Sequence, residues 1–382
     1  MAITSILVTG GAGYVGSHLV DRLVTQGYAV TVLDNLEPQV HRSGTWPSYA
    51  NPKAHYVRGD VRDRAVFEPL LLAADGVVHF GAAVSVGQSM YQIDRYVDVN
   101  TRGTALLLDI LVNAKHNVQK VLVASSIGVY GEGAYSCAVC GPVAPGIRPA
   151  EQLAARDWEQ HCPRCGLHVA SIPTPEDKAL YRDNIYSMTK YHQEEMVLLI
   201  GKTYGIPAVA ARFFNVYGPR QSLSNPYAGV AAIWLSRLMN GKQPVVFEDG
   251  GQLRDFVSIH DVVDCLVLML EKSGADYLPV NVGSGETVTI LEIARLLGRL
   301  LGVSIDPQIT ETGRKFDIRH NTADITRART ALGFQPKVSL EQGFSELIEW
   351  AKTTPDRAED FFDRALRELQ EKGLLVQGTA AP

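Results

Sequence analysis

Short runs of apolar and β-branched residues alternate with amphipathic stretches along the first third of the chain. Such runs are typical of parallel strands, which are covered by helices on both faces and need no polar side. Helices are expected between the runs, over about 17–28, 66–72 and 104–114, where apolar residues fall at helical spacing. The alternation predicts an α/β fold built on a doubly wound parallel sheet. The expected strands are residues 5–9, 29–34, 55–60, 76–83 and 120–126.

The rest of the chain has a less regular pattern. Residues 206–350 mix short apolar runs with amphipathic stretches such as 291–302, and we expect a smaller substrate-binding lobe with some segments returning to the sheet. The predicted division is therefore a nucleotide-binding domain over 1–131 and 173–205, an inserted module over 132–172, the lobe over 206–350, and a C-terminal helix with a frayed tail over 351–382.

Composition narrows the class of protein. The 382 residues carry a formal net charge of −5, which disfavours nucleic acid as a partner, because phosphate binding needs a concentrated basic face. No apolar run approaches the roughly 20 residues that span a bilayer. The N-terminus lacks the basic start and long apolar core of a signal peptide. We therefore expect a cytoplasmic protein with no membrane partner, whose thiols stay reduced.

The stretch GGAGYVG at 10–16 lies between a predicted strand and a predicted helix, the context of a dinucleotide-binding turn. Gly10 permits the tight turn, Gly13 lets the backbone approach a pyrophosphate, and Gly16 lets the helix pack on the strand. The N–H groups at the start of the helix suit phosphates. Asp34 ends the second strand, where a carboxylate binds a ribose diol and repels a 2′-phosphate. The pattern predicts NAD rather than NADP; the alternative is a plain glycine turn with a solvated Asp34.

A YxxxK pattern places Tyr186 and Lys190 on one face of a predicted helix. Ser125 and Ser126 end a predicted strand, and the dinucleotide turn upstream makes the combination specific. Tyrosine is a poor base at neutral pH, but a nearby ammonium and an oxidised nicotinamide favour the phenolate. We expect Tyr186 to take a proton from a sugar hydroxyl, Ser126 to orient the same oxygen, and Lys190 to hold the nicotinamide ribose. The alternative is a chance pair on an exposed helix.

These motifs resemble those of the extended short-chain dehydrogenase/reductases, in the nucleotide-sugar epimerase/dehydratase group. The resemblance covers about residues 3–350 apart from the cysteine segment, and runs through TGGAGYVGSHL, GDVRD, SSIGVYG, YSMTK, RFFNVYGPRQ, RDFVSIHDV and DIRHNTADI in the group's usual order. It implies an enzyme that binds NAD through Gly10, Gly13, Tyr14, Val15, Gly16, Asp34, Asn35, Asp60, Val61, Gly81, Ala82, Ala83, Asn100, Ser125, Tyr186, Lys190 and Phe214.

The same resemblance implies a nucleotide-sugar substrate. Arginine suits its diphosphate, because the guanidinium fork makes bidentate hydrogen bonds. For Arg254 the alternative is a surface ion pair with Asp255. The residues that the resemblance assigns to the substrate are Ser85, Val86, Ser126, Asn215, Arg220, Gln221, Arg254 and Asp317.

The segment SSIGVYG at 125–131 bears on the reaction. Dehydratases that resemble this chain carry an acid pair where Ile127 and Gly128 stand, and decarboxylating relatives usually carry a glutamate in this stretch. Neither Ile127 nor Gly128 can move a proton. What remains is oxidation at C4 of the sugar, rotation of the 4-keto sugar and return of the hydride to the opposite face, which is 4-epimerisation. The alternatives are a 4-keto-sugar reductase or dehydratase and, in another class, a non-catalytic dinucleotide-sensing protein.

Two CxxC pairs, each followed by glycine, are separated by 21 residues. This is the spacing of a zinc ribbon, and four thiolates make a closed site for a structural rather than a catalytic zinc ion. A redox-active CxxC is the alternative. Cys265 stands apart in an apolar helix and is expected to be a buried small hydrophobe. The predicted zinc ligands are Cys137, Cys140, Cys162 and Cys165.

The module is inserted between residues that the catalytic hypothesis uses, so we expect it at the rim of the active site. It has few apolar residues, and zinc would supply the missing stability. Two hypotheses follow: the module covers the sugar pocket, or it makes a dimer contact. The helix at 186–199 also carries more apolar surface than one sheet face requires, and helices of this kind pair in the family that the chain resembles. A homodimer is therefore expected.

Overall fold

The structure is a computed structural model that describes residues 3–227, 229–354 and 358–377. Its centre is a seven-stranded sheet of β1 (Ser5–Thr9), β2 (Ala29–Asp34), β3 (His55–Arg58), β4 (Gly76–His79), β5 (Lys120–Ser126), β9 (Ala208–Phe213) and β14 (Leu278–Val282). The strands lie in the order β14-β9-β5-β4-β1-β2-β3, and every neighbouring pair is parallel. This order confirms the Rossmann-type fold, and the strands expected in the first third are present at nearly the expected bounds.

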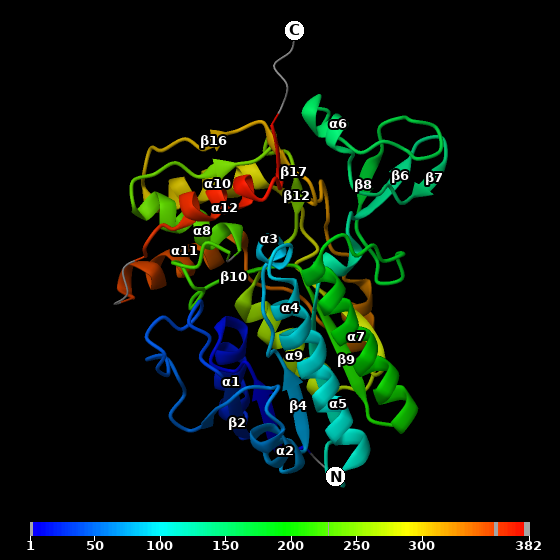
Figure 1. The fold of residues 1–382 in the computed structure, drawn as a ribbon, viewed down its shortest axis with the longest axis vertical. Coiled ribbons are helices and arrows are strands. Elements are labelled where there is room, and N and C mark those ends of the chain that lie inside the picture. Colours follow the sequence, from blue (N-terminus) through cyan, green and yellow to red (C-terminus); the bar gives the residue numbers. More distant parts are fainter. Residues whose placement is uncertain (1–2, 228, 355–357, 378–382) are drawn as a thin grey trace.

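Helices cover both faces of the sheet because alternate strand residues point to opposite sides. Ile6 and Val8 of β1 belong to a core shared with α1 (Tyr14–Thr25) and α9 (Ile259–Glu271). Cys265 of α9 is fully buried in that core, as predicted. On the other face, Leu7 packs with α2 (Arg64–Leu72), α5 (Gly103–Asn113) and α7 (Ile185–Tyr204). Figure 1 shows α5 and α7 lying side by side over this second face.

The connection between β4 and α5 is irregular. It contains two short helices, α3 (Val86–Ser89) and α4 (Ile93–Tyr96), and then a π-helical segment, Val97–Arg102, that runs directly into α5. π-Helical segments are rare and often occur at functional sites. The expected fourth strand therefore ends at His79 rather than at residue 83, and the backbone that follows is free to line a cavity.

The lobe packs around α8 (Val230–Met239), α10 (Ile290–Leu301) and α11 (Leu340–Thr353), whose buried side chains form a separate core with Trp234, Leu297 and Phe344. Four two-stranded sheets border it. They pair β10 (Asn215–Tyr217) with β13 (Phe256–Ser258), β11 (Val245–Val246) with β16 (Gln308–Ile309), β12 (Leu253–Arg254) with β15 (Val288–Thr289), and β17 (Thr312–Arg314) with β18 (Leu375–Gln377).

The C-terminal segment is more ordered than expected. It forms α12 (Phe362–Glu371), and residues 375–377 then pair with 312–314, because β17 offers a free antiparallel edge. The sequence suggests a frayed end over 373–382; residues 375–377 are paired instead, and 378–382 lie outside the described residues. Across the described ranges, no helix is both long and apolar enough to cross a membrane.

The inserted segment forms a small antiparallel sheet in the order β7-β6-β8, from β6 (Ala134–Cys137), β7 (Gly141–Val143) and β8 (Ala170–Ile172), with one short helix, α6 (Ala150–Ala154). Residues 132–172 are called the cysteine module below. In Figure 1 the module projects at the upper right, beside β12 and β17 of the lobe and away from the far end of the central sheet.

Candidate active site

A cavity of about 860 Å³ opens at the carboxyl ends of the sheet strands and extends into the lobe. Crevices of this kind bind ligands in open parallel sheets. All residues that the sequence analysis assigned to NAD line this cavity, with the exception of Asn100. Of the residues assigned to the substrate, Ser126, Asn215, Arg220 and Gln221 line it.

The turn between β1 and α1 has the geometry that its glycines suggested. Gly10 adopts φ +68°, and a Cβ on it would lie 3.0 Å from the backbone of residues 80 and 81. A Cβ on Gly16 would lie 2.4 Å from the Gly10 carbonyl oxygen, so side chains are sterically excluded at both positions. Gly13 is the N-cap of α1 and, having no side chain, leaves the N-terminus of the helix uncapped. The turn therefore leaves backbone N–H groups facing the cavity, which suits a pyrophosphate.

Asp34 lies at the end of β2 with its carboxylate against this turn. The N–H of Ala12 donates to Oδ2 at 3.0 Å, and the N–H of Leu36 donates to Oδ1 at 2.9 Å. The backbone thus fixes the carboxylate at the cavity wall, where it disfavours a ribose 2′-phosphate and leaves lone pairs for a diol.

The next strand end adds a second carboxylate. Asp60 accepts a hydrogen bond from Asn35 Nδ2 at 3.0 Å and two from Arg62, at 2.8 Å each. The hydrogen bonds from Arg62, more than those from Asn35, lower the pKa of Asp60 to about 2, so it is ionised at neutral pH.

Asn100, also assigned to the cofactor, is not among the residues that line the cavity. It is fully buried in the π-helical segment, its Oδ1 accepts from the Ala83 N–H at 2.7 Å, and its Nδ2 donates to the Ala83 carbonyl at 3.0 Å. Nδ2 also donates to Thr189 Oγ1 at 2.9 Å. Asn100 therefore ties the Ala83 backbone, which does line the cavity, to α7.

The three predicted catalytic side chains meet at the cavity wall. Tyr186 and Lys190 come from the first turns of α7, and Ser126 comes from the end of β5. The Ser126 hydroxyl is close enough to the Tyr186 phenol to lower its pKa, and Lys190 Nζ donates to the Ala124 carbonyl at 2.9 Å. The contact of α7 with β5 and Asn184, which caps the helix by accepting from the Ser187 N–H, hold this end of the helix in place.

Electrostatics at this site differ from the expectation in one respect. Burial raises the pKa of Tyr186 to about 12, and the Ser126 hydroxyl opposes this shift. Burial also lowers the pKa of Lys190 to about 7, so its ammonium is only partly formed at neutral pH. The protein's own groups therefore do not favour the phenolate. The positive charge of an oxidised nicotinamide beside the phenol would act in the opposite direction and lower the Tyr186 pKa.

Behind the site lies a buried ion pair that the sequence analysis did not predict. Glu194 lies four residues after Lys190 on α7, accepts from Ser125 Oγ at 2.5 Å and pairs closely with Arg212 of β9, and both charged side chains are almost fully buried. Arg212 also donates to Tyr130 Oη at 2.9 Å. The position of Glu194, four residues after Lys190, indicates that both lie on one face of the helix. The sequence does not indicate that its partner is Arg212 on a distant strand.

The sequence analysis also did not predict that the long loop after β2 forms part of the cavity wall. Residues 39–49 contribute much of the cavity lining, including Trp46 and Tyr49. The Arg220 guanidinium stacks over the Tyr49 ring at 4.9 Å and pairs with Asp21 at 2.7 Å. Two aromatic residues in a polar loop were the signal in the sequence.

On the substrate side, Asn215 and Gln221 are among the residues that line the cavity. Asn215 Oδ1 and Gln221 Oε1 are buried and have no hydrogen-bond partner among the described residues. The Tyr14 hydroxyl, on the cofactor side, is also buried and has no hydrogen-bond partner among the described residues. Buried polar atoms are normally satisfied, so these three are suited to a polar ligand.

Four residues assigned to the substrate lie off the cavity. Ser85 caps α3 by accepting from the Gln88 N–H at 3.1 Å, and Val86 is the first residue of that helix. Arg254 and Asp317 lie 3.8 Å apart in the lobe, and the buried Arg254 donates to the carbonyls of residues 318 and 319. The alternative ion pair of Arg254 with Asp255 is not formed, because Asp255 accepts from Ser284, Gly285 and Ala323.

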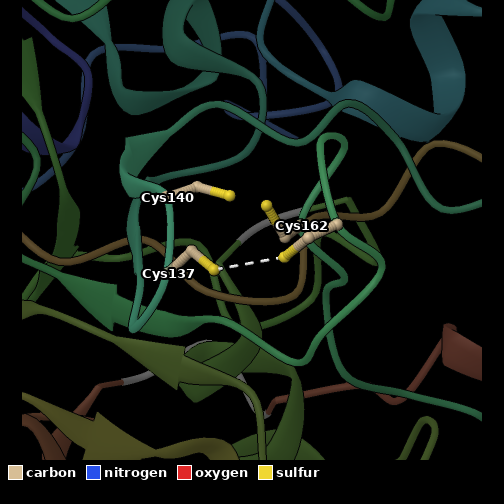
Figure 2. A group of neighbouring side chains, drawn as sticks. Cys137, Cys140 and Cys162 are labelled. Carbon is tan, nitrogen blue, oxygen red and sulfur yellow. Dashed lines mark hydrogen bonds between the residues drawn. The ribbon is translucent and has the colours of Figure 1, made fainter.

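The four cysteines of the module converge. Their sulfur atoms lie within 4.8 Å of one another, and Cys137 Sγ stands 3.6 Å from Cys165 Sγ. Four thiolates around a tetrahedral zinc ion stand roughly 3.8 Å apart, so the geometry fits. Figure 2 shows Cys137, Cys140 and Cys162 pointing toward one another. The glycines after each pair have φ of +70° and +75°, and the Arg164 N–H donates to Cys162 Sγ at 3.4 Å.

The module does not wall the cavity. None of residues 132–172, all of which the structure describes, is among the lining residues. The module contacts the lobe instead, as shown for α6 and the β17–β18 pair. The hypothesis of a cover over the sugar pocket is therefore not supported by this arrangement.

Comparison with known proteins agrees with this geometry. The model of the NAD dependent epimerase/dehydratase family matches residues 6–146 and 167–283. A dTDP-L-rhamnose 4-epimerase of Burkholderia thailandensis is 35% identical over 356 residues, which cover 92% of this chain and 96% of the relative. The crystal structure of a UDP-glucose 4-epimerase from Thermotoga maritima, with UDP-glucose, matches with a TM-score of 0.75 at 30% identity, over 92% of this chain and all of that one. A UDP-glucuronic acid 4-epimerase from Bacillus cereus, in complex with UDP-glucuronic acid and NAD, matches with a TM-score of 0.74 at 26% identity, over 91% and 99%.

Proposed function

Because the chain belongs to the NAD-dependent epimerase/dehydratase family, we propose that it is an NAD-dependent nucleoside-diphosphate-hexose 4-epimerase, acting on a UDP- or dTDP-linked sugar. The observation that carries this proposal is the meeting of Ser126, Tyr186 and Lys190 at one wall of the cavity, beside Ile127, which has no titratable group. A site with one proton-transferring group and no second acid or base suits an oxidation that is reversed within the same turnover.

The protein's residues have distinct tasks in this reaction. NAD accepts the hydride from C4 and returns it. Tyr186 takes the proton of the C4 hydroxyl and gives it back after the sugar has turned, and its burial keeps water from competing for that proton. Ser126 donates to or accepts from the same oxygen and holds it near the phenol. Lys190, anchored on the Ala124 carbonyl, keeps its remaining N–H groups for the nicotinamide ribose and the phenolate.

The nucleotide sugar is proposed to lie between the sheet and the lobe. Asn215 and Gln221 offer unsatisfied polar atoms on the cavity side, and Arg220 offers a cation. Arg254 and Asp317, which the resemblance assigns to the diphosphate, lie deeper in the lobe and would meet it at the inner end. Ser85 and Val86 would act through the neighbouring Val84 and Gln88, which line the cavity.

The cysteine cluster is proposed to hold one structural zinc ion. Four thiolates complete a tetrahedral shell and leave no open position for chemistry, and the convergence of the sulfurs supports this donor set. Reduced thiols of this kind suit the cytoplasm, which we propose as the compartment. A homodimer is also proposed, through the exposed apolar residues on α7 such as Met188 and Leu199.

The decisive experiment is incubation of the purified protein with a panel of UDP- and dTDP-linked hexoses and 6-deoxyhexoses, followed by separation of the C4 epimers. We expect interconversion of one epimer pair with no net consumption of added NADH. Steady consumption of reduced cofactor with a 4-keto sugar would show a reductase instead, and release of water to a 4-keto-6-deoxy product would show a dehydratase. Binding of NAD without turnover of any sugar would favour the non-catalytic sensing protein.

A further inference from the structure

A cluster of buried charges joins the cysteine module to the lobe. Arg148 of the module makes a fork on Glu248 of the lobe, with hydrogen bonds of 2.9 Å to Oε2 and 2.7 Å to Oε1, and neither side chain is exposed. Arg148 also donates to the Trp158 carbonyl at 2.9 Å and to the Asp317 carbonyl at 3.3 Å. A bidentate pair of this kind fixes orientation as well as distance.

A second residue of the module, Glu132, hydrogen-bonds to the lobe segment 317–320, which Arg148 also contacts. The Glu132 carboxylate accepts the backbone N–H of Arg319 and, at 3.4 Å, that of His320, and it is 1% exposed. Gly133 adds a backbone bond, its N–H donating to the His320 carbonyl at 2.9 Å. A Cβ at Gly133 would lie 2.6 Å from that carbonyl oxygen, so the two chains approach as closely as glycine allows.

The opposite side of this segment is held by Arg254. Its guanidinium donates to the Ile318 carbonyl at 2.7 Å and to the Arg319 carbonyl at 2.8 Å. Residues 317–320 therefore lie between the module on one side and Arg254 on the other. We call Glu132, Arg148 and Glu248 the module–lobe clamp.

Glu248 carries a backbone conformation that needs support. Its φ of +57° lies in the left-handed region, which a non-glycine residue adopts at a cost and keeps only where its surroundings hold it. Its backbone is hydrogen-bonded to Thr312 and Glu311, at 3.1 Å each, and its side chain is held by two arginines, because Arg319 Nη1 also donates to Glu248 Oε2, at 3.0 Å. Both arginines thus belong to the path between the module and residues 317–320.

We propose that Glu132 and Arg148 of the cysteine module are positioning residues for the nucleoside diphosphate of the substrate. They fix residues 317–320, and through them the side chains of Arg254 and Asp317. This inference rests on the proposed function, because it takes Arg254 and Asp317 as the groups that hold the diphosphate. The module then affects the substrate without touching the cavity, and the NAD half of the site is independent of it.

The structure offers a matched control. Arg156 and Glu311 also join the module to the lobe, with 2.7 Å between Nη1 and Oε2, but their side chains are 45% and 51% exposed. Exposed pairs contribute little, so Arg156→Gln should leave the lobe unchanged. Arg148→Met removes the fork and keeps the buried stem, and Arg148→Lys keeps the charge with a single donor group.

The test measures the dissociation constants of UDP, dTDP and NAD by calorimetry, together with KM, kcat and zinc content, for the full-length zinc-loaded protein and these variants. For Arg148→Met we expect binding of the preferred nucleoside diphosphate to weaken at least tenfold and KM to rise alike, while the NAD dissociation constant and zinc content stay as in the wild type. Arg148→Lys should recover part of the loss, and Arg156→Gln should show none.

An unchanged dissociation constant for the nucleoside diphosphate in Arg148→Met would overturn the proposal, as would a parallel weakening of NAD, which would indicate a general loss of structure. If Arg148→Met does not fold, Arg148→Lys decides: a raised KM at normal kcat supports positioning, and an unchanged KM contradicts it. Wild-type protein that binds a nucleoside diphosphate but epimerises no sugar would sink the proposed activity and leave this inference standing. Wild-type protein that binds neither UDP nor dTDP would overturn this inference.

Discussion

The central sheet buries apolar side chains on both faces, whereas the apolar cluster inside the cysteine module consists of four buried side chains. These four are Tyr135, Cys137, Cys162 and Val169. The sheet also receives helices from distant parts of the chain, so its core is continuous from β14 to β3. The module instead has converging sulfur atoms at one end and the buried Arg148–Glu248 ion pair with the lobe at the other.

This difference separates two kinds of stability. A large apolar core draws its stability from buried apolar area, which does not depend on a bound metal ion. A small segment that lacks such a core needs a cross-link such as a bound metal ion in order to fold. Buried charges that lose their partners oppose folding. The sheet should therefore keep its fold and its cofactor under conditions that unfold the module.

Removal of zinc should produce the largest effect. Structural zinc sites contribute on the order of 10 kcal/mol to the folding of small zinc modules. Dialysis against a chelator should therefore unfold residues 132–172 and raise the substrate KM at least tenfold, while NAD binding persists. Hydrogen exchange resolved by mass spectrometry would show whether the loss of protection stops at the module.

Cys162→Ser should reproduce this result, whereas Cys265→Ala, which removes a buried thiol from α9, should keep its zinc. Loss of NAD binding together with the zinc would contradict the separation of the two regions.

Tyr186→Phe tests the catalytic site of the sheet region without changing the cysteine module. Removal of a single proton-transferring group costs 10²–10⁴-fold in rate, so we expect kcat to fall by about 10³-fold. The ring remains in place against Tyr96, and both zinc content and NAD affinity should be those of the wild type. Tyr191→Phe, on the same helix and stacked under Arg182, is the control and should keep full activity. Retention of most turnover in Tyr186→Phe would refute the assigned base.

Glu194→Ala tests how the sheet half depends on one buried charge pair. The change leaves the Arg212 guanidinium buried without its carboxylate, and breaking such pairs costs about 3–5 kcal/mol. The free energy of unfolding, from urea denaturation of the zinc-loaded protein, should fall by about that amount. Glu195→Ala, exposed on the next position of α7, should change it by less than about 0.5 kcal/mol. Equal effects of the two variants would show that the pair is not stabilising.

The sequence predicted the sheet half well because its signals are local. Strand, glycine turn and helix follow one another within about 30 residues, and Asp34 and Ser126 stand at strand ends whose place in the sheet follows from the alternation. The loop 39–49 was missed because its approach to the cavity depends on contacts such as Arg220 over Tyr49, far apart in the chain.

The lobe was predicted less well because its contacts connect distant residues. Arg254 meets residues 318 and 319, and Arg148 meets Glu248, across 65 and 100 positions of the chain. Neither pairing has a periodic signature. The cysteine spacing predicted that four thiols converge, which they do. The surface on which the module lies is set by Glu132 and Arg148, whose partners the spacing of the cysteines does not specify.

The smallest effect expected is a change of cofactor preference in Asp34→Asn. The two oxygens of Asp34 accept the backbone N–H groups of Ala12 and Leu36, so the amide can keep one of these hydrogen bonds and loses the charge. Without that charge a 2′-phosphate is repelled less, and the ratio of the NADP and NAD dissociation constants should shift by about tenfold toward NADP, roughly 1.4 kcal/mol. Asp63→Asn, the N-cap of α2, should leave the ratio unchanged.

The same measurement on chelator-treated protein sharpens the comparison of the two regions. Asp34 belongs to β2, and the cysteine module contributes no residue to the cavity that Asp34 lines. The shift caused by Asp34→Asn should therefore be equal with and without zinc, because distant sites with no shared partners act additively. A shift that disappears on zinc removal would mean that the module supports the cofactor half as well, and the two regions would then have to be treated as one unit.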